Sequence, residues 1–297
     1  MTNSQTVPER HHQLARMRTL QVADVKLTFV PDGSAWIDPA ALFPTSTEAD
    51  WQANAGYLDD AGQLINTIGG LLVERDGRAL LIDAGVGAVS SPAWGGVIGA
   101  VESGEMLNNL ARIGWAPETI ETVAITHLHY DHIGWAWNDA PSSDQPAFRN
   151  AEYLISDSEW AGRAEVGEHG IHPEALERLE PRIRTFGNGD EIFPGVHAEV
   201  RGGHTSGHTT FVITAGTHRV VVFGDLFLTS AQVAHPDWPL TIDHDPQLTV
   251  AERHRLLEDL AKPDTIGVGA HFADVVFGRI ASDDEATWVP VEAQEVV

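Results

Sequence analysis

A segment of seven residues, 126–132, constrains this chain more than any other part of its sequence. It contains three histidines and one aspartate, and it follows the apolar run 122–125, which is typical of a buried strand. Side chains on one face of a helix recur at i and i+3 or i+4, whereas His127 and His129 are two residues apart. The spacing therefore predicts a loop at the end of a strand, with side chains that converge on a divalent metal.

Composition excludes several classes of function. The chain has 297 residues, enough for one large domain or two small ones. A formal net charge of -25 predicts repulsion from nucleic acid and from anionic membrane surfaces. Cysteine is absent, which excludes disulfides, thiolate ligands and a cysteine nucleophile. No apolar run reaches the roughly 18 residues of a membrane span, and no secretory segment is evident, so a cytoplasmic location is expected.

The chain is expected to form one domain over residues 19–297, preceded by a flexible N-terminal arm at residues 1–18. His11 and His12 in that arm are expected to be an exposed pair and not a site. His169 and His172 are expected to be solvated, because the glycines and proline around them argue against a regular helix that would align them, and His254 is expected to be solvated on the charged side of a predicted helix.

Residues 22–30 predict a strand, and residues 31–63 predict a long loop rich in aromatic rings. Such a loop either covers a pocket or uses its rings only to hold itself against the body, and the sequence leaves both open. Residues 90–100 contain small and apolar side chains that suit a mobile pocket wall or a dimer contact. A homodimer therefore also stays open.

A hairpin is predicted over residues 69–87, with its turn at Asp76 and Gly77. Asp83 follows the return strand and is expected to support the metal ligands, unless it forms only an Asx turn. A helix is predicted at 105–113, and Gly134 is expected to let the chain turn away tightly after the histidine-rich loop.

Further ligand-type residues follow other predicted strands. His204 comes after the run 196–200, Asp225 after 220–223, and His271 after 265–269, which is expected to be the last core strand. An amphipathic helix is predicted at 246–261, with a buried face formed by Leu248, Leu256, Leu257 and Leu260.

With these residues assembled, the sequence resembles the metallo-β-lactamase fold superfamily. The resemblance covers about residues 22–277 and implies an α+β fold, a four-layer αββα sandwich with a metal site at the sheet edge. It is carried by the motifs at 127–132, 203–208, 224–225 and 269–271, and by Asp83 within 81–85.

The resemblance also implies a ligand set for two divalent metal ions, taken to be zinc. One ion would be held by His127, His129 and His204. The other would be held by Asp131, His132 and His271, with Asp225 bridging the two. His208 is expected to be structural, and Tyr130 is expected to lie near the site.

A hydrolase with this site would use a metal-bridging hydroxide on a lactone or neutral ester. Asp131 or Asp225 would take a proton as the leaving group departs, and the sequence does not decide between them. Within the superfamily, the segments 234–238, 269–272 and 278–280 resemble quorum-quenching lactonases and methyl-parathion-hydrolase-like members. A small uncharged or hydrophobic substrate is expected. The alternatives are a mononuclear iron dioxygenase on the same ligands, a thioester or phosphotriester hydrolase, and a non-catalytic binding protein.

Overall fold

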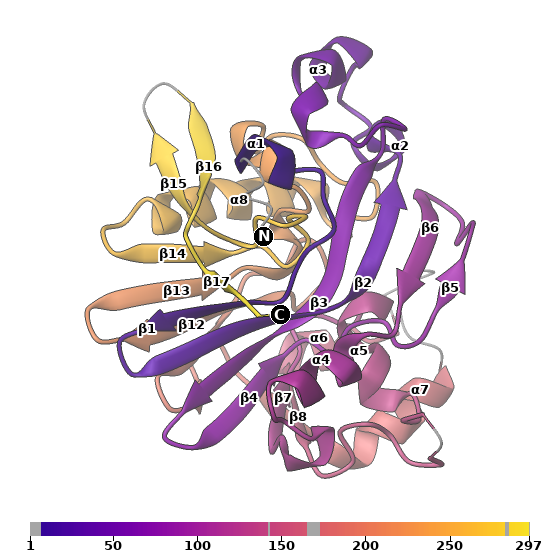
Figure 1. Ribbon diagram of the computed structural model, residues 1–297, viewed down its shortest axis with the longest axis vertical. Coiled ribbons are helices and arrows are strands. Elements are labelled where there is room, and N and C mark those ends of the chain that lie inside the picture. The colour runs from indigo at the N-terminus through magenta and orange to yellow at the C-terminus, as the bar shows by residue number, and fades with distance from the viewer. Residues whose placement is uncertain (1–6, 142, 165–172, 283–284, 297) are drawn as a thin grey trace.

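Two β-sheets lie face to face, and helices cover the outer face of each, as expected for an αββα sandwich (Figure 1). The computed structural model describes residues 7–141, 143–164, 173–282 and 285–296. No helix among these residues is long and apolar enough to cross a membrane. His169 and His172, which were expected to be solvated, lie outside the described residues.

The first sheet has ten strands. They are β1 (Arg18–Val22), β2 (Val25–Ile37), β3 (Leu64–Arg75), β4 (Arg78–Ile82), β5 (Ser90–Ser91), β6 (Ile98–Ser103), β7 (Thr122–Ala124), β8 (Glu152–Ser156), β9 (Ile183–Phe186) and β17 (Gln294–Glu295). Their order is β17-β1-β2-β3-β4-β7-β8-β9, and β6 pairs with β2 and β5. The four neighbouring strands β4, β7, β8 and β9 run parallel, so the carboxyl ends of β4 and β7 meet at one edge.

The second sheet has seven strands that follow chain order. They are β10 (Glu191–Phe193), β11 (Val196–Val200), β12 (Thr209–Ala215), β13 (His218–Val222), β14 (Thr265–Val268), β15 (Phe277–Ser282) and β16 (Ala286–Pro290). Only the pairing of β13 with β14 is parallel, with Val222 opposite Val268. That pairing places the residues after both strands at the same edge of the sheet.

The helices occupy the outer layers and the connections. They are α1 (Val7–Arg10), α2 (Pro39–Leu42), α3 (Glu48–Ala53), α4 (Met106–Arg112), α5 (Tyr130–Trp137), α6 (Asp157–Ala161), α7 (Pro173–Leu179) and α8 (Pro246–Leu260). Short 3-10 turns lie at η1 (Ala55–Tyr57), η2 (Pro117–Thr119), η4 (Glu180–Arg182), η5 (Gly224–Leu226) and η6 (Ser230–Ala234). In Figure 1, α4 to α7 lie on the side of β7 and β8, and α8 lies beside β14.

Apolar side chains fill the space between each pair of layers. Phe29 and Phe211 are fully buried between the two sheets. Leu72 of β3 and Leu110 of α4 belong to the layer outside the first sheet, and Leu256 of α8 belongs to the layer outside the second. Burial of apolar surface, which contributes about 25 cal/mol per Å², is the main force that holds the four layers together.

The predicted hairpin, the helix at α4 and the helix at α8 are confirmed. The predicted buried face of α8 is partly wrong, because Leu248 is 37% exposed. Thr249, Glu252 and Arg253 are buried there instead. Hydrogen bonds and ion pairs to these polar groups offset their burial, which apolar periodicity does not reveal.

The single strand predicted at 22–30 is confirmed for residues 25–30 but is divided near its start, and the long loop predicted at 31–63 is wrong. A turn at Ala23, with φ 48°, separates β1 from β2. β2 then continues through Pro31, which sits at a register shift, to Ile37. A proline is tolerated at such a bulge because the bulge spares a ladder hydrogen bond. The short helices α2 and α3 and the turn η1 then interrupt the rest of the segment.

Two further expectations differ from the structure. The run 265–269 is not the last core strand, because β15 and β16 follow and bury Phe277 and Trp288. The chain does not turn away at Gly134, because this residue lies within α5 and packs against Val86.

The division of the chain at residue 18 stays a prediction, but residues 10–18 contact the rest of the protein. The guanidinium groups of Arg10 and Arg18 pair with the buried carboxylate of Asp274. The expectation of an exposed pair at His11 and His12 is wrong. The ring of His11 is partly buried with Nδ1 2.8 Å from Ser230 Oγ, and His12 Nδ1 lies 2.9 Å from a backbone carbonyl oxygen.

Candidate metal centre

The seven expected ligands lie together at one edge of the sandwich. They form two groups, and the ligand atoms within each group lie within 4.8 Å of one another. The first group is His127, His129, His204 and Asp225, and the second is Asp131, His132 and His271. Both sheets contribute, because the first sheet supplies the segment after β7 and the second supplies the segments after β11, β13 and β14.

The histidine-rich segment is a loop only as far as His129. Tyr130 begins α5, so Asp131 and His132 lie in the first helical turn, which corrects the prediction of a loop throughout. The helix starts there because the backbone carbonyl of His132 and the amides of residues 134 and 135 bond to residues 84 and 85 after β4. Asp131 and His132 therefore point back toward the strand ends.

In the first group, three ring nitrogens converge. His127 Nε2 lies 2.9 Å from His129 Nδ1, and His204 Nε2 lies 3.0 Å from the same atom. Asp225 Oδ2 lies 3.6 Å from His127 Nε2 and 3.4 Å from His204 Nε2. All four side chains of this group are buried, so bulk water does not screen the interactions between them.

The other oxygen of Asp225 belongs to the second group. Asp225 Oδ1 lies 2.9 Å from His271 Nε2 and 3.2 Å from His132 Nε2. Asp131 adds its two oxygens at 3.6 Å from His132 Nε2 and 3.7 Å from His271 Nε2. One oxygen of Asp225 thus faces each group, which is the arrangement a bridging carboxylate needs.

The outward nitrogens of three rings bond to acceptors, so their Nε2 lone pairs face inward. A donated Nδ1–H fixes the ring tautomer and leaves Nε2 as the ligand atom. These contacts are His132 Nδ1 to Asp83 Oδ2 at 2.9 Å, His204 Nδ1 to Asp243 Oδ1 at 3.0 Å, and His271 Nδ1 to the Thr67 carbonyl at 2.6 Å. Buried imidazole lone pairs that meet without a hydrogen between them are stabilised by a cation. The residues therefore fit two divalent metal ions, and imidazole with carboxylate suits zinc.

The pKa shifts report the same need for positive charge. Burial lowers the pKa of His204, but hydrogen bonds and charges of Asp225 and Asp243 raise it to about 9. Burial and the neighbouring histidines hold the pKa of His127 well below its usual range. Burial alone would raise the pKa of Asp225, yet His271 and the other rings hold it well below its usual range. The carboxylate therefore stays ionised although it is buried.

Two residues outside the ligand set behave as expected. Asp83, at φ 64°, accepts hydrogen bonds from His132 and from the backbone N–H of Thr126 at 2.8 Å, so it supports the ligands. His208 Nε2 accepts from the backbone N–H of Asp225 at 3.0 Å and is therefore not directed at the ligand groups. The parallel pairing of β4 with β7 explains the first contact, because it aligns Asp83 with the start of the histidine-rich loop.

The sequence did not indicate Glu159, which is buried at the start of α6. Its Oε1 accepts from the N–H of Leu128 at 2.8 Å, between two ligand histidines. Its Oε2 accepts from Thr205 Oγ1 at 2.7 Å and from the N–H of Gly207 at 2.9 Å, just after His204. One carboxylate thereby joins the two loops that carry the first group. In the sequence it resembled only an acidic residue in a first helical turn.

Asp243 and Arg253 were also missed. Asp243 orients His204, and its other oxygen lies 3.2 Å from Arg253 Nη2. Arg253 is fully buried on α8 and also donates to the carbonyl oxygen of Leu226, next to Asp225. The same guanidinium therefore holds the supports of His204 and Asp225. No spacing signal could have revealed this, because Asp243 and Leu226 lie outside the helix that carries Arg253 and follow no helix or strand period with it.

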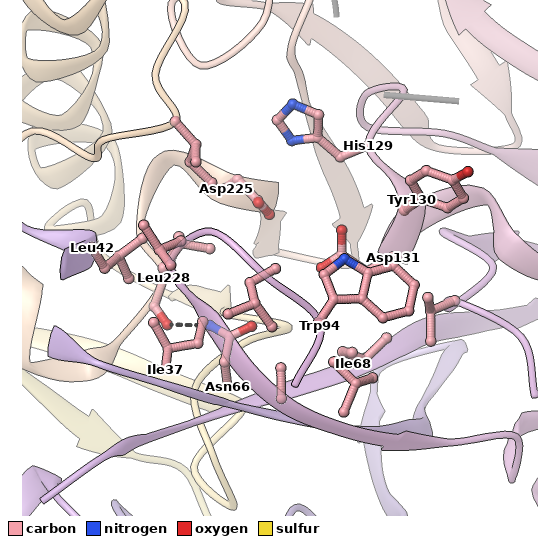
Figure 2. Close-up of a pocket in the computed structure, with 16 residues that line it drawn as sticks. Ile37, Leu42, Asn66, Ile68, Trp94, His129, Tyr130, Asp131, Asp225 and Leu228 are labelled. Carbon is pink, nitrogen blue, oxygen red and sulfur yellow. Dashed lines mark hydrogen bonds between the residues drawn. The ribbon is translucent and has the colours of Figure 1, made fainter. Parts of the chain in front are cut away.

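An apolar cavity of about 100 Å³ opens beside the ligands. Figure 2 shows His129, Asp131 and Asp225 at one side of it, with Ile37, Asn66 and Ile68 across from them. The further lining residues are Ala35, Leu42, Val86, Trp94, Val97, Ile98, Val101, Tyr130, Leu228 and Ile242.

The two segments whose role the sequence left undecided, 31–63 and 90–100, both contribute to this cavity. The segment 90–100 lines it with Trp94, Val97 and Ile98, so it is a pocket wall. The segment 31–63 lines it with aliphatic side chains, whereas its rings hold it to the body. Phe43 and Trp51 pack against Trp238, with ring centroids 5.7 and 5.3 Å away.

Comparisons with known proteins agree with this geometry. The sequence pattern described as "Metallo-beta-lactamase superfamily" matches residues 71–271. An N-acyl homoserine lactonase of Bacillus thuringiensis is 24% identical over 257 residues, 81% of this chain and 90% of that protein. A second, from Bacillus sp, is 26% identical over 200 residues, 63% of this chain and 70% of that protein.

Solved structures with the same fold cover nearly the whole chain. AidC, described as a dizinc quorum-quenching lactonase in complex with a product, superimposes with a TM-score of 0.80 at 20% identity, covering 95% of this chain and 100% of AidC. The hydrolase AbOPH gives a TM-score of 0.75 at 22% identity, over 95% and 100% of the two chains. An N-acyl homoserine lactone hydrolase with its product at the metal centre gives 0.65 at 23% identity, over 85% and 94%.

Proposed function

Because this chain belongs to the metallo-beta-lactamase superfamily, we propose that it hydrolyses lactones or neutral esters with two divalent ions, zinc in the first instance. The observation that carries the proposal is the position of Asp225. Its two oxygens face separate ligand groups at the mouth of an apolar cavity. N-acyl homoserine lactones are the first substrates to test, because curated relatives are named for that activity.

In this proposal His127, His129 and His204 would hold one ion, and Asp131, His132 and His271 would hold the other, with Asp225 contributing one oxygen to each group. When bound, the two ions would supply a water-derived nucleophile near neutral pH and would polarise the carbonyl under attack.

The residues of the chain do the remaining work. The cavity wall of Ile37, Ile68 and Trp94 excludes water and accepts an uncharged substrate, which the net charge of -25 also favours over anions. Asp131 is the carboxylate placed to move a proton. Both side chains line the cavity, but that of Asp131 is 30% exposed, whereas that of Asp225 is 4% exposed and lies closer to its histidine partners.

Elemental analysis of the purified 297-residue chain, beside assays with a lactone, a thioester, a carboxylic ester and a phosphotriester, tests the proposal. We expect two metal ions per chain and the highest kcat/KM with the lactone. One iron per chain with oxygen consumption would instead identify a dioxygenase. Full loading with two ions and no hydrolysis of any substrate would overturn the proposal.

A further inference from the structure

Asn66 places a single hydrogen-bond acceptor on the otherwise apolar wall across from the ligands (Figure 2). Its side chain lies on β3 and is 5% exposed. The other polar groups that line the cavity are those of the metal centre, Tyr130 and the indole of Trp94. A polar side chain at this position is costly to bury unless it has a partner.

The orientation of the amide follows from its one hydrogen bond. Asn66 Nδ2 donates to the carbonyl oxygen of Leu228 at 3.1 Å. A carbonyl oxygen can only accept, so the nitrogen must face it and Oδ1 must face the other way. Figure 2 shows Oδ1 turned away from that bond. In the part of the chain that the structure describes, no donor reaches Oδ1.

Neighbouring contacts hold Asn66 beside the metal centre. It forms a β-bridge with Phe272, the residue after ligand His271. Leu228, which receives its amide hydrogen bond, follows Asp225 by three residues. The backbone of Asn66 and its side chain are thus each tied to a ligand-bearing segment, and the acceptor has a fixed position relative to the reacting centre.

We propose that Asn66 Oδ1 accepts a hydrogen bond from an N–H group on the substrate arm that occupies this cavity. The enzyme then selects lactones that carry a secondary amide over those that lack a donor. This inference rests on the proposed lactone hydrolysis. A substrate without the N–H leaves the buried acceptor unpaired, which costs about tenfold to a hundredfold in kcat/KM.

Two substrates that differ in one atom test the inference on the metal-loaded enzyme. They are γ-butyrolactones with a hexanoylamino or a hexanoyloxy arm, so oxygen replaces N–H. The wild type is expected to prefer the amide about tenfold to a hundredfold. Asn66→Leu, and Asn66→Ser as a milder variant, are expected to bring the ratio close to one. A residue that only supports Leu228 would lower both rates and leave the ratio unchanged.

Ile68→Val is the control, since it lies on the same strand and wall but has no hydrogen-bonding group. It is expected to retain the preference. A wild-type ratio of about one, or a preference that survives in both Asn66 variants, would overturn the inference while lactone hydrolysis stands. If neither lactone is hydrolysed, the proposed function fails, and calorimetry with the two γ-lactam analogues decides the role of Asn66. Equal affinity or no binding overturns it.

Discussion

A Cβ atom built on Gly134 would lie 2.0 Å from the carbonyl carbon of Val86. Gly134 lies on α5 two residues after His132, and Val86 lies three residues after Asp83. The absence of a side chain at Gly134 lets the helix touch the segment after β4. That contact keeps His132 beside the carboxylate of Asp83.

Gly134→Ala should therefore destabilise the fold and disturb the second ligand group. We expect a loss of about 3 kcal/mol in the free energy of unfolding, the upper part of the range for overpacking, because the opposing atoms are backbone. Urea denaturation measures it. Gly56→Ala is the control, since a Cβ there meets nothing within 4 Å. Equal stability of the two variants would contradict the packing argument.

Replacing His127 by alanine should remove a ligand of the first group. Metal content should fall below that of the wild type, and hydrolysis should fall by about a hundredfold or more. Elemental analysis and kcat/KM measure the two effects. His254→Ala, at an exposed histidine that pairs with Asp237, should change neither. A His127→Ala protein with full metal content and full activity would refute the assignment of this residue.

Arg253→Met should be costly although Arg253 touches no ligand. It removes the cation beside Asp243 and the donor to Leu226, and breaking a buried pair from one side costs about 3–5 kcal/mol. Metal affinity should also fall, because Asp243 orients His204. Thermal melting and a metal titration provide the measurements. On the same helix, Arg255→Met should cost about 1 kcal/mol or less, since the side chain of Arg255 is 64% exposed.

Stability between pH 8 and pH 4 should depend in part on His11. Burial, followed by the charges of Arg10 and His12, lowers the pKa of His11 from 6.5 to about 4. A depressed pKa means that the unfolded chain binds the proton first. Stability is therefore fully present above pH 6.5 and is lost as pH falls toward 4, by at most about 3 kcal/mol at about 1.36 kcal/mol per unit.

His11→Asn should lose less stability over that pH range than the wild type. Denaturation at pH 8 compares the two side chains when both are neutral, so the difference between pH 8 and pH 5 isolates the proton. Identical losses in the two proteins would mean that His11 does not titrate with folding.

The sequence predicts the chemistry of the centre better than its support. All seven expected ligands meet because each follows a strand, and strand ends gather at a sheet edge. Glu159, Asp243 and Arg253 are invisible to that reasoning. They act through contacts with residues elsewhere in the chain, such as that of Glu159 with Gly207. A single acidic or basic residue forms no repeating pattern in the sequence that would predict such a contact.

The fold shows the same division. The hairpin of β3 and β4 was predictable because its turn at Asp76 and Gly77 is a local signal. The continuation of β2 to Ile37 was not, because β3 and β6 stabilise it from both sides. Proline and turn-forming residues in that stretch favour a loop until the neighbouring strands are considered.

Each oxygen of Asp225 faces one histidine that follows a strand of the first sheet and one that follows a strand of the second. This arrangement has a consequence for the lifetime of the folded state. Each sheet can gain its own hydrogen bonds before the other forms, but neither holds a complete set of ligands. With the proposed ligands, metal capture would follow docking of the sheets, and separation of the sheets would release metal. Unfolding should then slow as the concentration of free metal rises, with the ions acting as a cross-link between the two halves of the chain.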